Sequence, residues 1–77
     1  MTIFTKNSQE MLNALERKGL KSGTMVSTDE YLVINQDQYF SLPEQSVERA
    51  ARMYREEGEV VKDLSRDCCI GDVVDLL

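Results

Sequence analysis

The chain has 77 residues, of which 42% are hydrophobic and 30% are charged, and this composition indicates one small globular domain spanning residues 1–77. No apolar run approaches the roughly 20 residues of a membrane-spanning helix, and the first six residues are too short and polar for a secretory signal, so we expect a cytoplasmic protein with no membrane segment. The net charge is −5, with four acids and four bases in residues 1–36 but ten acids and five bases in residues 37–77. This acidic half disfavours direct binding of nucleic acid, which needs a basic face, and favours a partner with a basic surface.

The first predicted helix covers residues 8–19. Asn7 or Ser8 can cap its first turn, because a side-chain oxygen there accepts an otherwise unpaired backbone N–H. Gly19 ends the helix, since glycine adopts the left-handed conformation at low cost. The apolar side chains that share one face are Met11, Leu12 and Leu15. Residues 3–4, ahead of the helix, form either a short strand or a hydrophobic contact with its first turns.

Three segments rich in β-branched and aromatic residues follow the first helix. They predict a three-stranded antiparallel meander over residues 24–28, 31–35 and 38–42. If residues 36–37 form a two-residue loop, Ile34 faces Tyr39 and Val33 faces Phe40. Both faces of this hairpin then carry apolar side chains, so we expect helices to cover one face and a partner to cover the other.

The second predicted helix covers residues 43–58. It starts at Pro43, whose missing N–H is harmless in a first turn, and ends at Gly58. Its buried stripe is Val47, Ala50, Ala51 and Tyr54, at i, i+3, i+4 and i+7. A third helix is predicted from residues 63–65 to about Leu77. It either closes the core or reaches a second copy of the chain, so a homodimer is one expectation.

Together these segments predict an α+β fold, with an N-terminal helix, a three-stranded antiparallel β-meander and two C-terminal helices packed on one face. Each element is apolar on at least one side, and these sides would pack against each other. The predicted core consists of Leu12, Leu15, Val33, Phe40, Val47, Ala51 and Tyr54.

The adjacent cysteines Cys68 and Cys69 do not indicate a metal site. A zinc site needs about four ligands, and the chain offers two cysteines that point in different directions on a helix and no histidine. We therefore expect no metal and no cofactor, and we expect one cysteine to be buried, leaving open which of the two. The chain also has no nucleophile elbow and no phosphate loop, so we expect that it is not an enzyme.

The main functional hypothesis is a small acidic protein-binding module that modulates or inhibits a partner by occluding its surface. Its size and charge are those of inhibitors encoded by phages and mobile elements, so a host nucleic-acid enzyme is one such partner. The acidic candidate contact residues are Glu56, Glu57, Glu59, Asp63, Asp67, Asp72 and Asp75. Tyr31 and Tyr39 are added because tyrosine is enriched at binding hot spots, and we expect one of the two to be exposed.

The alternative hypothesis is a dimeric DNA-binding transcriptional regulator. Residues 38–58, a strand, a proline, an amphipathic helix and a glycine, resemble the strand and first helix of ribbon-helix-helix repressors. The resemblance implies that polar ribbon residues read the major groove. The corresponding residues here are Gln38, Tyr39 or Phe40, and Ser41. The ribbon lacks lysine and arginine, so the basic surface of such a regulator would come from Arg49, Arg52, Arg55, Lys18 and Lys21.

Overall fold

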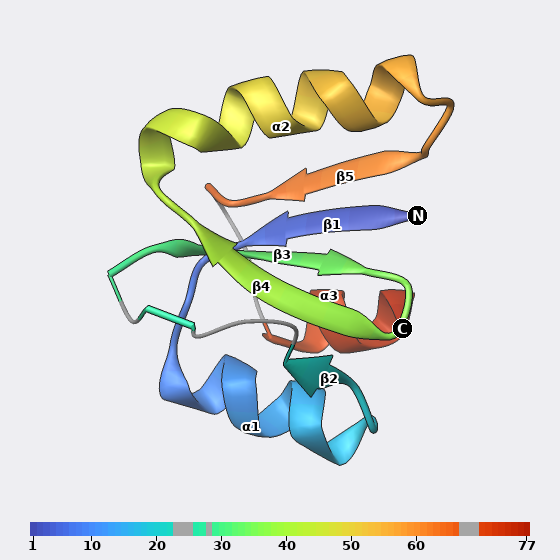
Figure 1. The fold of residues 1–77 in the computed structure, drawn as a ribbon. Coiled ribbons are helices and arrows are strands. Elements are labelled where there is room, and N and C mark those ends of the chain that lie inside the picture. The colour runs from blue at the N-terminus through green and yellow to red at the C-terminus, as the bar shows by residue number, and fades with distance from the viewer. Residues whose placement is uncertain (23–25, 28, 67–69) are drawn as a thin grey trace.

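The computed structural model describes residues 1–22, 26, 27, 29–66 and 70–77, and these form three helices and a mixed five-stranded sheet (Figure 1). The strands are β1 (Thr2–Thr5), β2 (Lys21–Ser22), β3 (Tyr31–Asn35), β4 (Gln38–Leu42) and β5 (Val61–Leu64). The helices are α1 (Gln9–Arg17), α2 (Glu44–Glu56) and α3 (Ile70–Leu76). The strand order is β2-β4-β3-β1-β5, which places β1 inside the sheet and β5 at one edge.

Strands β3 and β4 form the hairpin that the sequence predicts. Ile34 pairs with Tyr39 and Val33 pairs with Phe40, so the predicted register is confirmed. A two-residue loop fixes which residues lie opposite each other in an antiparallel pair. Gln36 in this loop has a positive φ of 57°, the left-handed conformation that tight hairpin turns use.

Strand β1 joins segments that are far apart in the sequence. It pairs antiparallel with β3 and parallel with β5, so Phe4 lies beside Val33 on one side and Asp63 on the other. All four residues of β1 are buried. Because side chains alternate along a strand, Ile3 and Phe4 each supply an apolar group to a different face of the sheet.

Helices cover both faces of the sheet (Figure 1). One face packs against α1 and α3, and its buried cluster is Ile3, Met11, Leu15, Leu32, Ile34, Tyr39 and Val73. The other face packs against α2, and its buried cluster is Phe4, Val33, Val47 and Ala51. The ring of Phe4 meets Tyr54 of α2 edge to face, with centroids 6.2 Å apart.

The ends of α1 and α2 follow local signals. The Ser8 hydroxyl accepts a hydrogen bond from the Met11 N–H at 3.1 Å, which satisfies one free donor of the first turn. Gly19 and Gly58 have φ values of 83° and 88° just beyond the two helices, where glycine adopts the left-handed conformation most readily. The apolar stripes predicted for both helices face the core.

The predicted fold class is wrong in its sheet and in the placement of its helices. The sheet has five strands with parallel and antiparallel pairs, and is not a three-stranded antiparallel meander. In the segment predicted as the first strand, the described residues Val26 and Ser27 are not in a strand. The two C-terminal helices α2 and α3 lie on opposite faces rather than on one, because β1 and β5 complete a sheet with two apolar faces (Figure 1).

The third helix begins later than predicted. Residues 63–64, predicted as its start, belong to β5, and α3 begins at Ile70. The helix does close the core, since Val73 is fully buried against the α1 side of the sheet. The predictions for Cys68 and Cys69 concern residues outside the described part of the chain.

Candidate functional site: the groove between α2 and β5

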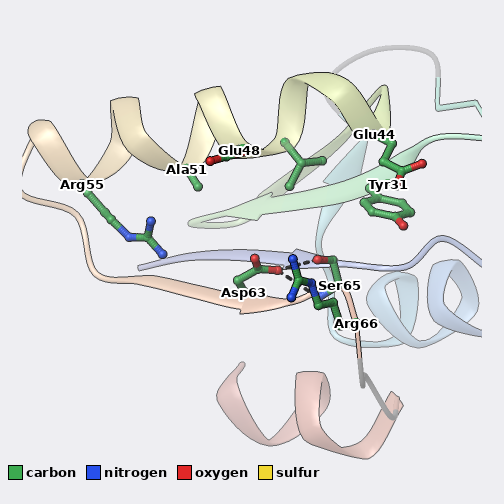
Figure 2. A pocket seen from close by; sticks show the side chains of 9 residues that line it. Tyr31, Glu44, Glu48, Ala51, Arg55, Asp63, Ser65 and Arg66 are labelled. Atoms are coloured by element: carbon green, nitrogen blue, oxygen red, sulfur yellow. Dashed lines mark hydrogen bonds between the residues drawn. The ribbon is translucent and has the colours of Figure 1, made fainter.

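A groove of about 470 Å³ runs between one flank of α2 and the edge strand β5 (Figure 2). We call it the α2–β5 groove. Its lining residues are Tyr31, Glu44, Val47, Glu48, Ala51, Arg55, Asp63, Ser65 and Arg66. The buried side chains of Val47 and Ala51 give it an apolar floor, and exposed charged groups form its walls. Such a combination suits a ligand with both apolar and charged groups.

One line of side chains on α2 forms the upper wall of the groove. Glu44, Glu48, Ala51 and Arg55 lie at i, i+4, i+7 and i+11, and this spacing keeps them on one flank of a helix. The two glutamates lie in the first half of α2 and Arg55 lies in its last turn. The wall therefore changes from negative to positive along its length.

The lower wall is organised around Asp63. Its carboxylate accepts hydrogen bonds from the Ser65 hydroxyl and from the Ser65 N–H, the latter at 3.1 Å. These bonds, the Ser65 hydroxyl first among them, hold the pKa of Asp63 below its usual range, and the positive charges of Arg66 and Arg55 lower it further. Figure 2 shows Arg66 beside Asp63 and Arg55 reaching from α2 toward β5. The carboxylate is thus ionised and held in place at neutral pH.

Among the described residues, strand β5 pairs with β1 alone, so its other edge is open. The Thr2 N–H donates to the Val60 carbonyl at 2.8 Å, and in a parallel pair such bonds recur on alternate residues. The backbone groups of Lys62 and Leu64 therefore face β1, and those of Val61 and Asp63 face away from the sheet. The open edge lies next to the groove, because Val61 and Asp63 also point their side chains toward the α2 face.

The predicted acidic residues fall into three places. Glu56 and Glu57 are exposed at the end of α2, and Glu59 lies in the turn that leads to β5. Asp63 is in the α2–β5 groove, separated from those glutamates by the length of β5. Asp72 and Asp75 are exposed on α3, on the opposite face of the sheet, and Asp67 lies outside the described residues (Figure 1).

Glu59 is occupied by contacts within the chain. Its carboxylate lies 3.1 Å from the amino group of Met1 and accepts a hydrogen bond from the Thr2 hydroxyl at 3.2 Å. The hydrogen bond to the amino terminus is the main cause that lowers the pKa of Glu59. The Thr2 hydroxyl in turn accepts from the Asn35 amide at 2.7 Å. Glu59 therefore joins the β5 turn to β1, which limits its part in binding a partner.

The two predicted tyrosines have different surroundings. Tyr31 is half-buried and lines one end of the α2–β5 groove. Tyr39 is only 5% exposed and packs in the cluster on the α1 side of the sheet, so its side chain is not part of an exposed contact surface. The hairpin register, in which Tyr31 pairs with Leu42 and Tyr39 with Ile34, places these two rings on opposite faces of the sheet.

The cations proposed for a DNA-binding surface do not converge. Arg49 and Arg52 are exposed on α2, Arg55 enters the groove, and Lys18 and Lys21 lie at the end of α1 and in β2, on the other side of the molecule (Figure 1). Strand β4, which corresponds to the ribbon of the ribbon-helix-helix repressors, is paired with β2 on one edge and β3 on the other. The β2 pairing covers Gln38 and Tyr39, so that part of the β4 edge is not available to pair with a second copy.

Several groove residues were absent from the sequence-based site. Ser65, Arg66, Glu44 and Glu48 line the groove, although neither hypothesis named them as contact residues. Two local signals point to Glu44, Glu48 and Ser65. A helical projection shows that Glu44, Glu48 and Arg55 share one flank of α2. An aspartate side chain often accepts a hydrogen bond from the backbone two residues later, which links Asp63 to Ser65.

Within the described ranges, no group of three or more acidic, histidine or cysteine side chains is arranged to hold a metal ion, and no helix is long and apolar enough to cross a membrane. Comparisons with protein-family models, with curated proteins and with solved structures gave no match. The geometry of the site is therefore the basis for proposing a function.

Proposed function

We propose that this chain is a non-enzymatic protein-binding module that acts in the cytoplasm and modulates or inhibits a partner by covering part of its surface. The observation that carries the proposal is the open edge of β5 beside the α2–β5 groove. An unpaired strand edge offers backbone donors and acceptors that another protein can satisfy. The apolar floor and charged walls beside it offer places for that protein's side chains.

The charge of the chain supports a partner with a basic surface. The net charge is −5, and Glu56 and Glu57 are exposed beyond the Arg55 end of the groove. A field of one sign speeds association with a surface of the opposite sign and disfavours partners of like charge. A nucleic-acid enzyme is one partner with such a surface.

Site-specific crosslinking tests whether the groove is the contact. A photoreactive amino acid replaces Glu48 in the groove wall or, as the matched control, Glu16 on the exposed side of α1. Both variants are irradiated in nuclease-treated lysate of the native host. We expect one protein to be crosslinked from position 48 and not from position 16. Equal crosslinking from both positions, or none from position 48, would contradict the proposal.

Charge reversal tests the contribution of the acidic turn. The variant E56K/E57K and the control E10K/E16K change the net charge equally, and all four glutamates are exposed. We expect the first pair to weaken binding of the crosslinked partner and to flatten its salt dependence, because it removes the exposed negative charges just beyond the Arg55 end of the groove. If both pairs weaken binding equally, only the overall charge of the chain matters and the acidic turn is not a contact.

A further inference from the structure

We propose that the occupant of the α2–β5 groove is an extended segment of another protein, which adds to β5 as an antiparallel strand and carries a basic side chain four residues before an acidic one. This inference rests on the proposed function and specifies the ligand of the same site. It follows from the backbone edge of β5, from the charge order along α2 and from the charges on β5.

The backbone of β5 sets the register of the added strand. Val61 and Asp63 direct their backbone N–H and C=O groups away from β1, as the bond from Thr2 N–H to the Val60 carbonyl requires. An antiparallel segment satisfies all four groups when one of its residues lies opposite Asp63 and the residue two further on lies opposite Val61. Residues directly opposite each other point to the same face, so these two ligand side chains enter the groove.

The charges on α2 set the sequence of the added strand. Glu44 stands at the end of the groove where β5 finishes, and Arg55 stands where β5 begins, because α2 and β5 run in opposite directions (Figure 1). Glu48 lies between them, above Asp63 (Figure 2). On a helix, Arg55 lies about 10 Å from Glu48 and about 16 Å from Glu44 along the axis. Ligand residues four apart on a strand are about 14 Å apart and share one face. An antiparallel ligand therefore places its basic residue first, near the glutamates, and its acidic residue near Arg55.

The residue between these two charges meets the floor of the groove. It lies opposite Asp63 and points toward the α2 face, where Val47 and Ala51 are buried. The carboxylate of Asp63 is already engaged by Ser65. A small or β-branched apolar side chain fits this central position, since it buries apolar surface and leaves no unpaired polar group.

The charges of β5 disfavour a second copy of this chain as the occupant. Two β5 strands related by a two-fold axis would be antiparallel, with the α2 face of both sheets on the same side. Residues opposite each other must then share a face, so the axis passes beside one residue, which lies opposite its own copy. Pairing about Lys62 or about Asp63 places that residue opposite its own copy. Pairing about Val61 brings Glu59 opposite Asp63. Pairing about Leu64 brings Lys62 opposite Arg66. Like charges directly opposite each other destabilise a strand pair, whereas a strand of different sequence avoids them.

A pair of short peptides tests the predicted ligand. The probe is acetyl-Gly-Lys-Thr-Val-Thr-Glu-Gly-amide, and its control has the lysine and the glutamate exchanged. Binding is followed by NMR on the full chain. We expect the amide signals of Val61 and Asp63 to shift and their hydrogen exchange to slow, while the amides of Lys62 and Leu64 change little. We expect the probe to bind about threefold to tenfold more tightly than the control, because two ion pairs become two repulsions.

N-methylated versions of the probe test the register without altering the protein. Methylation of the central valine nitrogen removes a donor that faces Asp63, and we expect a loss of about tenfold or more in affinity. Methylation of the preceding threonine nitrogen, which faces away from β5, should have little effect. In the protein, Arg55→Glu should weaken binding of the probe. The same variant should bind a peptide that has arginine in place of the probe's glutamate, because the ion pair is then re-formed with its charges exchanged.

Unchanged amides of Val61 and Asp63 at saturating probe, or equal binding of the control peptide, would overturn the inference. If crosslinking from position 48 nevertheless identifies a partner, the proposed function stands and the groove takes a folded surface instead of a strand. If the peptide binds as described and no protein is crosslinked, the groove accepts a strand and the proposed function fails.

Discussion

Replacement of Phe4 tests the central position of β1, which is the feature that most distinguishes the observed fold from the predicted one. The Phe4 side chain is fully buried and meets Tyr54 at a centroid distance of 6.2 Å. Loss of a buried phenylalanine to alanine costs about 3–5 kcal/mol. A chain of this length has a stability of roughly 4–12 kcal/mol. Phe4→Ala should therefore remove at least a quarter of the stability, and Phe4→Leu, which loses mainly the ring contact and shape, about 1–2 kcal/mol.

Urea unfolding followed by circular dichroism measures these changes, and the midpoint and slope together give the free energy of unfolding. Met53→Ala is the control, because Met53 is 54% exposed on α2 and its loss should alter stability by no more than about 0.5 kcal/mol. A double-mutant cycle with Tyr54→Leu isolates the ring contact. If Phe4→Ala changes the free energy of unfolding by less than about 1 kcal/mol, residues 3–4 lie at the surface ahead of α1 and the central placement of β1 is incorrect.

Three further predictions concern the turns and the groove. Gly58→Ala should destabilise the chain by about 1 kcal/mol, since its φ of 88° strains an alanine, although no atom of the described residues crowds the new methyl group. Gly71→Ala in α3 should instead stabilise the chain by about 0.5–1 kcal/mol. Thermal melts that move in the same direction for both would contradict this. Thr2→Val should cost about 1–2 kcal/mol in chemical denaturation, because the Asn35 amide loses its acceptor; a neutral result would show that water replaces the hydroxyl. The pKa of Asp63 is lowered in the folded state, so the ionised carboxylate stabilises the fold, by less than about 1 kcal/mol at this exposed site. This stabilisation is fully present above the pKa of the unfolded chain and is lost as the pH falls through the pKa of the folded state. Asp63→Asn should therefore lower the melting temperature at pH 7, and this effect should shrink as the pH falls below the ordinary pKa of an aspartate. An effect that stays constant as the pH falls would exclude the ionised carboxylate as its cause.

The sequence by itself determined the elements that local signals specify. Ser8 and Gly19 mark the ends of α1, Gly58 follows α2, and the two-residue loop of the hairpin sets the pairing of Val33 with Phe40. Each of these signals acts within a few residues, so the chain carries it independently of the rest of the fold.

Only the tertiary structure decided how β1 and β5 enter the sheet. Phe4 and Asp63 are neighbours in a parallel pair although 59 positions separate them, and no local pattern encodes such a contact. The side chain of Asp63 could equally cap a helix or accept a hydrogen bond in a turn, so local sequence does not predict that this residue lies in a strand. Its place in β5 depends on the pairing with β1.

The α2–β5 groove is also formed only by the tertiary structure. Its residues come from three segments, around Tyr31, along α2 and from Asp63 to Arg66, which approach one another only when α2 crosses the face of the completed sheet. The sequence could show that Glu44, Glu48 and Arg55 share one flank of a helix. It could not show which strand that flank faces, because the answer depends on the parallel pairing that places β5 at the edge.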